Sequence, residues 1–334
     1  MSWPPFESLP GLTPALRRRA VRDGLIISGW LVTGFVLIVV TALARSMGYD
    51  AYSYWSIDLT DLYGRTLDNN YGLGAFRYGP PIALLFAPLA ALPWWLFLWL
   101  WLALMLATIV WLGGRWGLVL LALPAVALEL YHGNVHWLIA AAVALGFRHP
   151  WTWSFVLLTK VTPGIGLLWF AVRREWRALA IALGATAIVS IASYVVAPNW
   201  WSEWIAATLS NVDRPQPFSI PPALPFRLPL AVLIVVWGAR TDRPWTVAVA
   251  ATVALPIVWV HGLVVALAAV PFLRRGDRAA LETDWRDAVR LRDYAVTLGL
   301  FAAVALAIAL VAPDAVANLM NEASRDLDPI ANRP

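Results

Sequence analysis

Apolar and polar positions divide this chain into long hydrophobic segments, separated by short basic turns and a few polar stretches. An α-helix needs about 20 apolar residues to cross a bilayer. The hydrophobic segments cover residues 24–44, 81–92, 95–113, 117–131, 136–147, 152–172, 178–197, 228–239, 245–257, 259–273 and 294–312. They predict an all-α, polytopic transmembrane protein of about 11 membrane helices, in one domain over residues 1–312. Segments that are shorter than a crossing and bounded by Pro or Gly predict broken helices buried in protein.

A long polar stretch, residues 46–80, directly follows the first hydrophobic segment. Tyrosines are interleaved there with four aspartates, which are Asp50, Asp58, Asp61 and Asp68. Carboxylates and amphipathic rings held at a membrane surface suit work on a polar headgroup attached to a lipid. We therefore interpret residues 46–80 as a long outer loop that carries catalytic groups.

The composition narrows the class of protein further. Mean hydropathy is +0.68 and 13% of residues are charged, values typical of polytopic membrane proteins. The net charge of +5 comes from arginines in short turns beside apolar segments, which fits the positive-inside rule and argues against nucleic acid as a partner. Cysteine is absent, which excludes a thiolate nucleophile, and no Walker loop, GxGxxG or HExxH motif occurs.

The arginines also predict an orientation. The cluster from Arg17 to Arg22 indicates a cytoplasmic N-terminus, and alternation of spans then places residues 46–80 on the outer face. The Pro-rich loop 198–227 and the polar tail 313–334 fall on the same outer side. Residues 277–292 predict a cytoplasmic amphipathic segment, or equally a solvated connector. The prediction is a multi-pass cell-membrane protein in contact with membrane lipids, with an active site outside.

Lys160 is the single lysine of the chain and lies inside a hydrophobic segment. A charge at that depth costs at least about 2.5 kcal/mol, so its ammonium should face a partner or a substrate. Pro163 should interrupt the helix just beyond it. We interpret Lys160 as a group that binds a lipid phosphate; the alternatives are a lysine that snorkels to the interface or one that pairs with a carboxylate such as Glu129.

Three histidines are candidates for chemistry. His132 and His136 have the i, i+4 spacing of metal ligands, but Gly133 should break the helix between them, and no third ligand stands in the motif. His261 falls at the outer end of a predicted helix pair, where it can donate to a phosphate or a sugar hydroxyl. A buried neutral histidine that bonds to backbone is an equal alternative.

Among the loop carboxylates, Asp50 lies nearest the membrane and is our candidate for the general base that acts on an acceptor hydroxyl. Asp58 remains a rival catalytic carboxylate. Arg65 and Arg77 offer forked donors to a phosphate or to sugar oxygens. Ion pairs with the aspartates of the loop are the alternative for both arginines, and such surface pairs stabilise little.

The order of these motifs resembles glycosyltransferase family 87. The motifs are D-x-Y-x-Y after the first span, then F-R-Y-G-P-P with the following P-L-x-x-L-P, then G-N-V, T-K-V-T-P and a basic R-R-x-W-R turn. The matching residues are Asp50, Tyr78, Pro80, Pro81, Pro88, Leu92, Pro93, Gly133, Asn134, Lys160, Thr162 and Pro163. The resemblance covers roughly residues 24–275.

The resemblance implies a GT-C-like membrane fold and an inverting hexosyltransferase of the mannosyltransferase type. Its donor would be a polyprenyl-phosphate sugar and its acceptor a lipid or glycan on the outer face. Asp50, or Asp58, would then be the base, and the donor phosphate would meet Lys160, His261, Arg77 and Arg65. Substrate would contact Tyr52, Tyr78, Asn134 and His132. No metal and no cofactor are expected, because cationic side chains can stabilise a monophosphate leaving group.

Two other readings fit some of the pattern. Broken helices and an intramembrane lysine also suit a lipid or small-molecule transporter or flippase. No inverted repeat is visible, however, and a long loop rich in Asp and Tyr is unusual for a minimal carrier. A non-catalytic membrane scaffold would leave Lys160 and the acidic loop without a purpose.

Overall fold

A computed structural model describes residues 14–44, 47–69, 72–210 and 219–273, together with short helical pieces between residues 299 and 311. Every regular element in these ranges is helical, which confirms the all-α prediction. The first half comprises α1 (Pro14–Ala44), α2 (Tyr49–Trp55), α3 (Gly64–Asp68), α4 (Pro80–Phe86), α5 (Trp94–Gly113), α6 (Pro124–His132), α7 (His136–Leu145) and α8 (Trp153–Thr159). The second half comprises α9 (Leu168–Val172), α10 (Trp176–Val196), α11 (Pro198–Leu209), α12 (Leu224–Arg240), α13 (Trp245–Val253) and α14 (Val270–Leu273).

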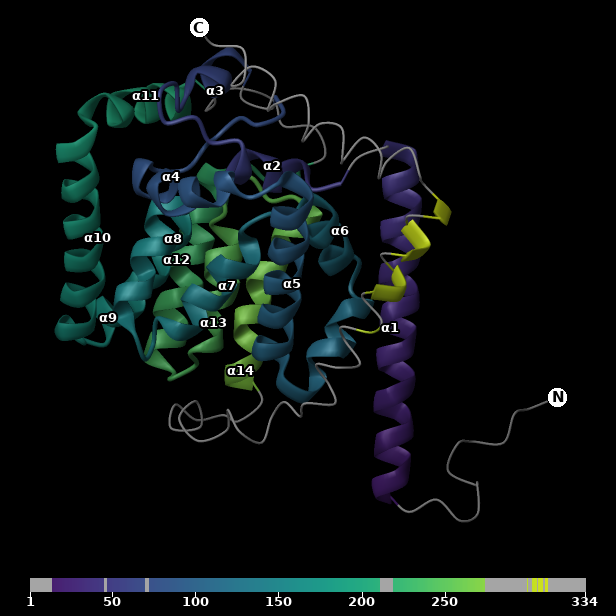
Figure 1. Cartoon of the computed structure of the whole chain (residues 1–334). Coiled ribbons are helices and arrows are strands. Elements are labelled where there is room, and N and C mark those ends of the chain that lie inside the picture. The colour runs from purple at the N-terminus through teal and green to yellow at the C-terminus, as the bar shows by residue number, and fades with distance from the viewer. Residues whose placement is uncertain are drawn as a thin grey trace, which may run out of the picture.

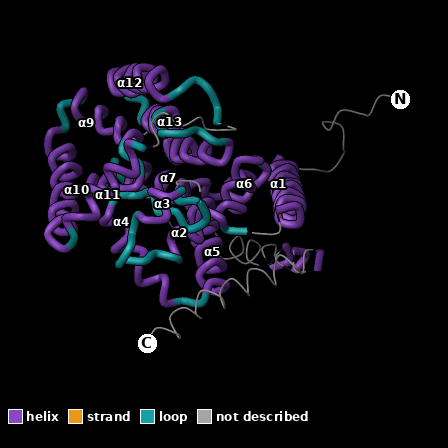
Figure 2. The backbone as a smooth tube through the Cα atoms, turned by 90° about the horizontal axis from the view of Figure 1, so that it is seen from above, coloured by secondary structure: helices purple, strands orange, loops and turns teal. Residues whose placement is uncertain are grey.

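Three of these helices are long and apolar enough to cross a membrane: residues 20–43 of α1, α5, and α10. They run roughly parallel in Figure 1, and in the view from above α1 and α10 lie at opposite edges of the molecule (Figure 2). Side chains of α10 are mostly exposed and apolar, as a lipid-facing helix requires. The protein is therefore a helical membrane protein.

The remaining apolar segments form shorter pieces. Several expected spans are divided between α-helix and 3₁₀-helix. The 3₁₀-helical parts are Gly114–Ala122 before α6, Thr162–Leu167 before α9 and Val260–Ala269 before α14. Pro or Gly stands at most of the breaks, and Pro interrupts a helix because it lacks a donor. The broken helices expected from the sequence are thus present, whereas a total of about 11 crossings stays a prediction.

The segment 198–227, which we expected to be a Pro-rich outer loop, contains helix, and its position outside the membrane stays a prediction. Its first part is α11, and its end already belongs to α12, which begins at Leu224. Pro225 is tolerated there because the first turn of a helix has no use for its missing N–H. The amphipathic segment at 277–292 and the tail 313–334 lie outside the described residues.

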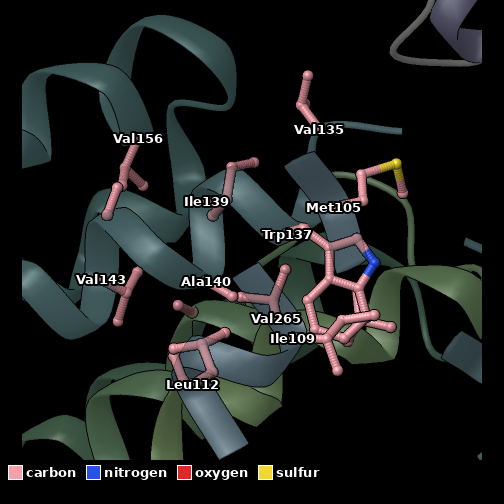
Figure 3. Close-up of a cluster of buried hydrophobic side chains, with 14 of the residues drawn as sticks. Met105, Ile109, Leu112, Val135, Trp137, Ile139, Ala140, Val143, Val156 and Val265 are labelled. Carbon is pink, nitrogen blue, oxygen red and sulfur yellow. The ribbon is translucent and has the colours of Figure 1, made fainter. Parts of the chain in front are cut away.

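The core lies between α5, α7, α8 and the 260–269 segment. Figure 3 shows side chains from these elements converging, with the ring of Trp137 beside Met105 and Ile109. Trp137 and Ile109 are fully buried. This packing fixes the end of α7 that begins at His136, and so it supports the polar groups described next. Short helices α2, α3, α4 and α11 lie together at one end of the long helices, opposite α9 and α14 (Figure 1).

Candidate active site

Asp50 lies in the first turn of α2, where the contact between α2 and the end of α6 sets its position. The N–H of Gly48, just before α2, donates to the carbonyl of Tyr131 at 2.8 Å. Gly48 has a φ of 80°, a left-handed conformation that glycine adopts without a Cβ penalty. The chain therefore turns sharply after α1 and brings Asp50 beside residues 131–134.

The carboxylate of Asp50 is buried and faces three polar side chains. Oδ2 accepts a hydrogen bond from Nδ2 of Asn134 at 2.8 Å, and Nδ1 of His132 lies 3.8 Å from the same oxygen. A guanidinium nitrogen of Arg77 lies 3.9 Å from Oδ1. Asp50, Arg77, His132 and Asn134 form what we call the Asp50 cluster. Arg77 and His132 are its more exposed members, with side chains 25% and 28% exposed, and they mark its accessible edge.

Gly133 makes this arrangement possible. It ends α6 in a left-handed conformation with a φ of 66°, and its carbonyl accepts a hydrogen bond from Nε1 of Trp101 at 2.8 Å. A Cβ at this position would lie 2.7 Å from the Cβ of Ala51. Only glycine therefore lets α2 approach close enough for Asp50 to reach Asn134.

Beside the cluster, three buried residues form a second arrangement, which we call the Lys160 triad. Glu129 accepts two hydrogen bonds from His136, one from its backbone N–H and one at Nδ1, each 3.0 Å long. The ammonium of Lys160 lies 2.7 Å from Nε2 of the same histidine. Lys160 follows the end of α8 in an extended conformation. Lys160 thus contacts His136, and Glu129 stands behind that ring.

His261 joins the two arrangements. Its ring centroid lies 4.6 Å from that of His132 and 5.4 Å from that of His136. Nε2 of His261, Nδ1 of His132 and Oδ1 of Asn134 are buried, and none has a hydrogen-bond partner among the described residues. Buried polar atoms normally have partners, so these three are points at which a polar substrate can bind.

Tyr54 and Tyr78 complete one wall. Their hydroxyls are 3.0 Å apart, and the hydroxyl of Tyr54 also accepts from the N–H of Val135 at 3.2 Å. Burial raises the pKa of both phenols well above the ordinary value. Burial also lowers the pKa of His132, against the opposing charge of Asp50, so its ring is neutral near pH 7. The phenols therefore stay protonated near pH 7.

Glu129, His136 and His261 also have the chemistry of metal ligands, with ligand atoms all within 4.8 Å of one another. Both ring nitrogens of His136 are already engaged, however, by Glu129 and by Lys160. A divalent ion at this position would have to displace the ammonium of Lys160. The donor set therefore fits a lysine better than a metal.

The structure brings six of the candidate residues together; these are Asp50, Arg77, His132, Asn134, Lys160 and His261. It also places the hydroxyl of Tyr78 3.0 Å from that of Tyr54. Three other candidates lie differently. Asp58 is exposed and accepts hydrogen bonds from Thr60 within its own turn. Arg65 is exposed and donates to the hydroxyl of Ser56 at 3.2 Å. The ring of Tyr52 packs against Trp55 and Trp94.

The sequence signals for Glu129 and His136 were incomplete. In the sequence, Glu129 is only a possible partner of Lys160, and His136 is only half of a possible metal-binding pair. Their i, i+7 spacing across Gly133 gives no local pattern, because the helix between them ends and restarts. The sequence does contain one signal for both residues: a carboxylate, a histidine and a lone lysine all lie in apolar segments. Ionisable residues in such segments are expected to contact one another.

Residues 76–284 match the model of glycosyltransferase family 87. The chain belongs to this family. Membership makes the protein a membrane glycosyltransferase, and it sets aside the carrier and scaffold readings. The family match includes Arg77, residues 132–136, Lys160 and His261, while Asp50 lies before its start. No curated protein and no solved structure matches the chain.

Gly133→Ala is expected to weaken both the fold and the activity of this glycosyltransferase. The left-handed backbone costs a residue with a Cβ about 1 kcal/mol or more, and the contact with Ala51 would push α2 away from Asn134. We expect a lower melting temperature and a clear loss of sugar transfer. Gly184→Ala in α10 is the control, because its Cβ would meet nothing within 4 Å. Equal behaviour of the two variants would contradict this role of Gly133.

Proposed function

We propose that this family 87 protein transfers a hexose, namely mannose, from a polyprenyl-phosphate donor to a lipid or glycolipid acceptor on the outer face of the membrane. The reaction is a single inverting displacement. The oxygen of an acceptor hydroxyl bonds to the anomeric carbon as the bond from that carbon to the phosphate oxygen breaks. The hydroxyl proton passes to a base, and polyprenyl phosphate leaves with the electron pair.

The observation that carries this proposal is the buried carboxylate of Asp50, held by Asn134 and edged by Arg77 and His132. A general base must be positioned within hydrogen-bond reach of the proton that it takes. Asn134 fixes Oδ2, and Oδ1 remains directed toward the accessible side where Arg77 lies. We assign Asp50 as the base, and Asp58, which bonds within its own exposed turn, is the less favoured candidate.

The charges around Asp50 suit the departing phosphate. Lys160 and Arg77 carry positive charge, and His261 has an unpartnered buried nitrogen. Donors that are fixed in advance around developing negative charge often supply the largest catalytic term, about 10²–10³-fold for one donor. We assign Lys160, Arg77 and His261 to the phosphate, and His132 and Asn134 to the sugar or the acceptor.

A groove supports a donor with an apolar tail. It has a volume of about 500 Å³, begins at Val161, the residue after Lys160, and is lined by apolar side chains of the 162–171 segment, α10 and α12. Leu179 and Leu183 of α10 and Leu228 of α12 are among its lining residues. We assign the prenyl chain of the donor to this groove, since each CH₂ that is buried there contributes about 0.8 kcal/mol.

Leu183→Trp is expected to fill this groove and to raise KM for a long-chain polyprenyl-phosphate donor about tenfold, which corresponds to about 1.4 kcal/mol. KM for a donor with a short, water-soluble prenyl chain should not change. Ile188→Trp is the matched control, because Ile188 lies on the same helix, outside the groove, and is 70% exposed. Equal KM values for the two variants with the long donor would exclude the groove as the site of the chain.

A further inference from the structure

The proposed function leaves two buried side chains of the Lys160 triad without a role. Glu129 is fully buried and His136 is 2% exposed, and Glu129 accepts two hydrogen bonds from His136. A carboxylate that is buried away from water is costly unless it is hydrogen-bonded and balanced by an opposite charge. A buried carboxylate and an ammonium in an apolar segment, such as those of Glu129 and Lys160, both raise the free energy of membrane insertion. Charged groups of this kind inside a membrane protein commonly have a functional role.

The hydrogen-bond pattern fixes the tautomer of the histidine. An ammonium only donates, so the contact with Lys160 requires the proton of the neutral His136 ring to lie on Nδ1, facing Glu129. Nε2 then carries a lone pair and accepts from the ammonium of Lys160. The backbone N–H of His136, at the beginning of α7, gives Glu129 its second donor and favours negative charge there.

We propose that Glu129 and His136 are positioning residues that hold the ammonium of Lys160 at the donor phosphate. Glu129 selects the Nδ1–H tautomer, and His136 in turn anchors a flexible lysine at one hydrogen-bond distance. The carboxylate also balances the charge of Lys160 before the donor arrives. This inference rests on the proposed function, because it assigns to Lys160 the phosphate of the polyprenyl donor.

Glu129→Gln tests this assignment with little change of shape. The amide of the new side chain can donate to Nδ1, which moves the ring proton to Nε2 and turns that nitrogen from an acceptor into a donor. The ammonium of Lys160 would then lose its anchor. If Glu129 only packed in the core, Glu129→Gln would leave the contribution of Lys160 to kcat unchanged, and the losses of the two variants would multiply. If Glu129 positions Lys160, the losses would not multiply.

The experiment is a double-mutant cycle on the purified full-length protein in lipid vesicles. The variants are Glu129→Gln, Lys160→Gln and the combination of both. The measured quantities are kcat and KM for transfer from a polyprenyl-phosphate hexose, and Kd for polyprenyl phosphate. Each single variant should lower kcat about 10²-fold, with KM for the acceptor unchanged, and the double variant should be no worse than Lys160→Gln alone.

Multiplied losses in the double variant, near 10⁴-fold, would overturn the inference, as would wild-type kcat in Glu129→Gln. Glu129→Asp, which keeps the charge, should retain more activity than Glu129→Gln. If Glu129→Gln fails to fold, the cycle of His136→Gln with Lys160→Gln gives the same two outcomes. Glu175→Gln, at the opposite end of the molecule where Glu175 pairs with Arg173, is the control for losing a carboxylate. Absence of transfer by the wild type would instead overturn the proposed function, and this inference with it.

Discussion

Asp50→Asn is expected to reduce sugar transfer by about 10²–10⁴-fold, the range that a positioned general base contributes. The asparagine keeps the size of the side chain, and its carbonyl oxygen can still accept from Nδ2 of Asn134. It cannot take the proton of the acceptor hydroxyl. The loss should therefore fall on kcat, with little change in melting temperature or in Kd for polyprenyl phosphate.

The measurement is transfer of a radiolabelled hexose by variants of equal expression. Asp242→Asn is the matched control, because Asp242 lies in the turn between α12 and α13, away from the site, and asparagine tolerates its φ of 55°. Asp58→Asn separates the two candidate carboxylates. Near-normal transfer by Asp50→Asn together with a large loss in Asp58→Asn would move the base to Asp58 and contradict the assignment made here.

Arg227→Met is expected to destabilise the fold more than any surface substitution. The buried guanidinium donates to four backbone carbonyls, those of Pro222, Val253, Leu255 and Pro256. Loss of these donors leaves the buried carbonyl of Leu255 unsatisfied, at about 1–3 kcal/mol, and removes the donor from three part-buried carbonyls. Residues 253–256 directly precede the 260–269 segment, which carries His261. Movement of these residues should displace His261, so sugar transfer should fall as well.

We expect the melting temperature of the purified Arg227→Met variant to fall by roughly 5–10 °C, on the scale of a few degrees per kcal/mol. Arg240→Met is its control, because Arg240 ends the same helix, α12, and is exposed. Similar melting temperatures for the two variants would show that the carbonyls rearrange or take up water, and that Arg227 does not hold this segment.

Parts of the fold were predictable because they depend on local composition. The apolar segments at 24–44 and 95–113 fall within α1 and α5, and the segment at 178–197 matches α10 except for its last residue, since a lipid-spanning helix needs only length and hydropathy. The helix in 198–209 was missed because proline-rich surroundings favour a loop, whereas Pro198 itself occupies the first turn of α11, where proline is tolerated.

In the candidate site, too, the features that depend on local sequence were predictable and those that depend on tertiary contacts were not. Asp50, Asn134 and Lys160 could be selected from short motifs and from the cost of a charge in an apolar segment. Their mutual contacts depend on tertiary approach, such as that of Ala51 to Gly133, which no spacing reveals. For the same reason the sequence alone could not exclude Asp58 as a rival of Asp50 or separate Arg65 from Arg77, although Asp58 and Arg65 are exposed.

The most direct test of the central claim is the donor that the purified wild-type protein uses in lipid vesicles. The account predicts transfer of a radiolabelled hexose from a polyprenyl-phosphate donor to a lipid acceptor, with inverted anomeric configuration in the product, and no transfer from a nucleotide sugar. Transfer from the nucleotide sugar, or a product with retained configuration, would contradict it.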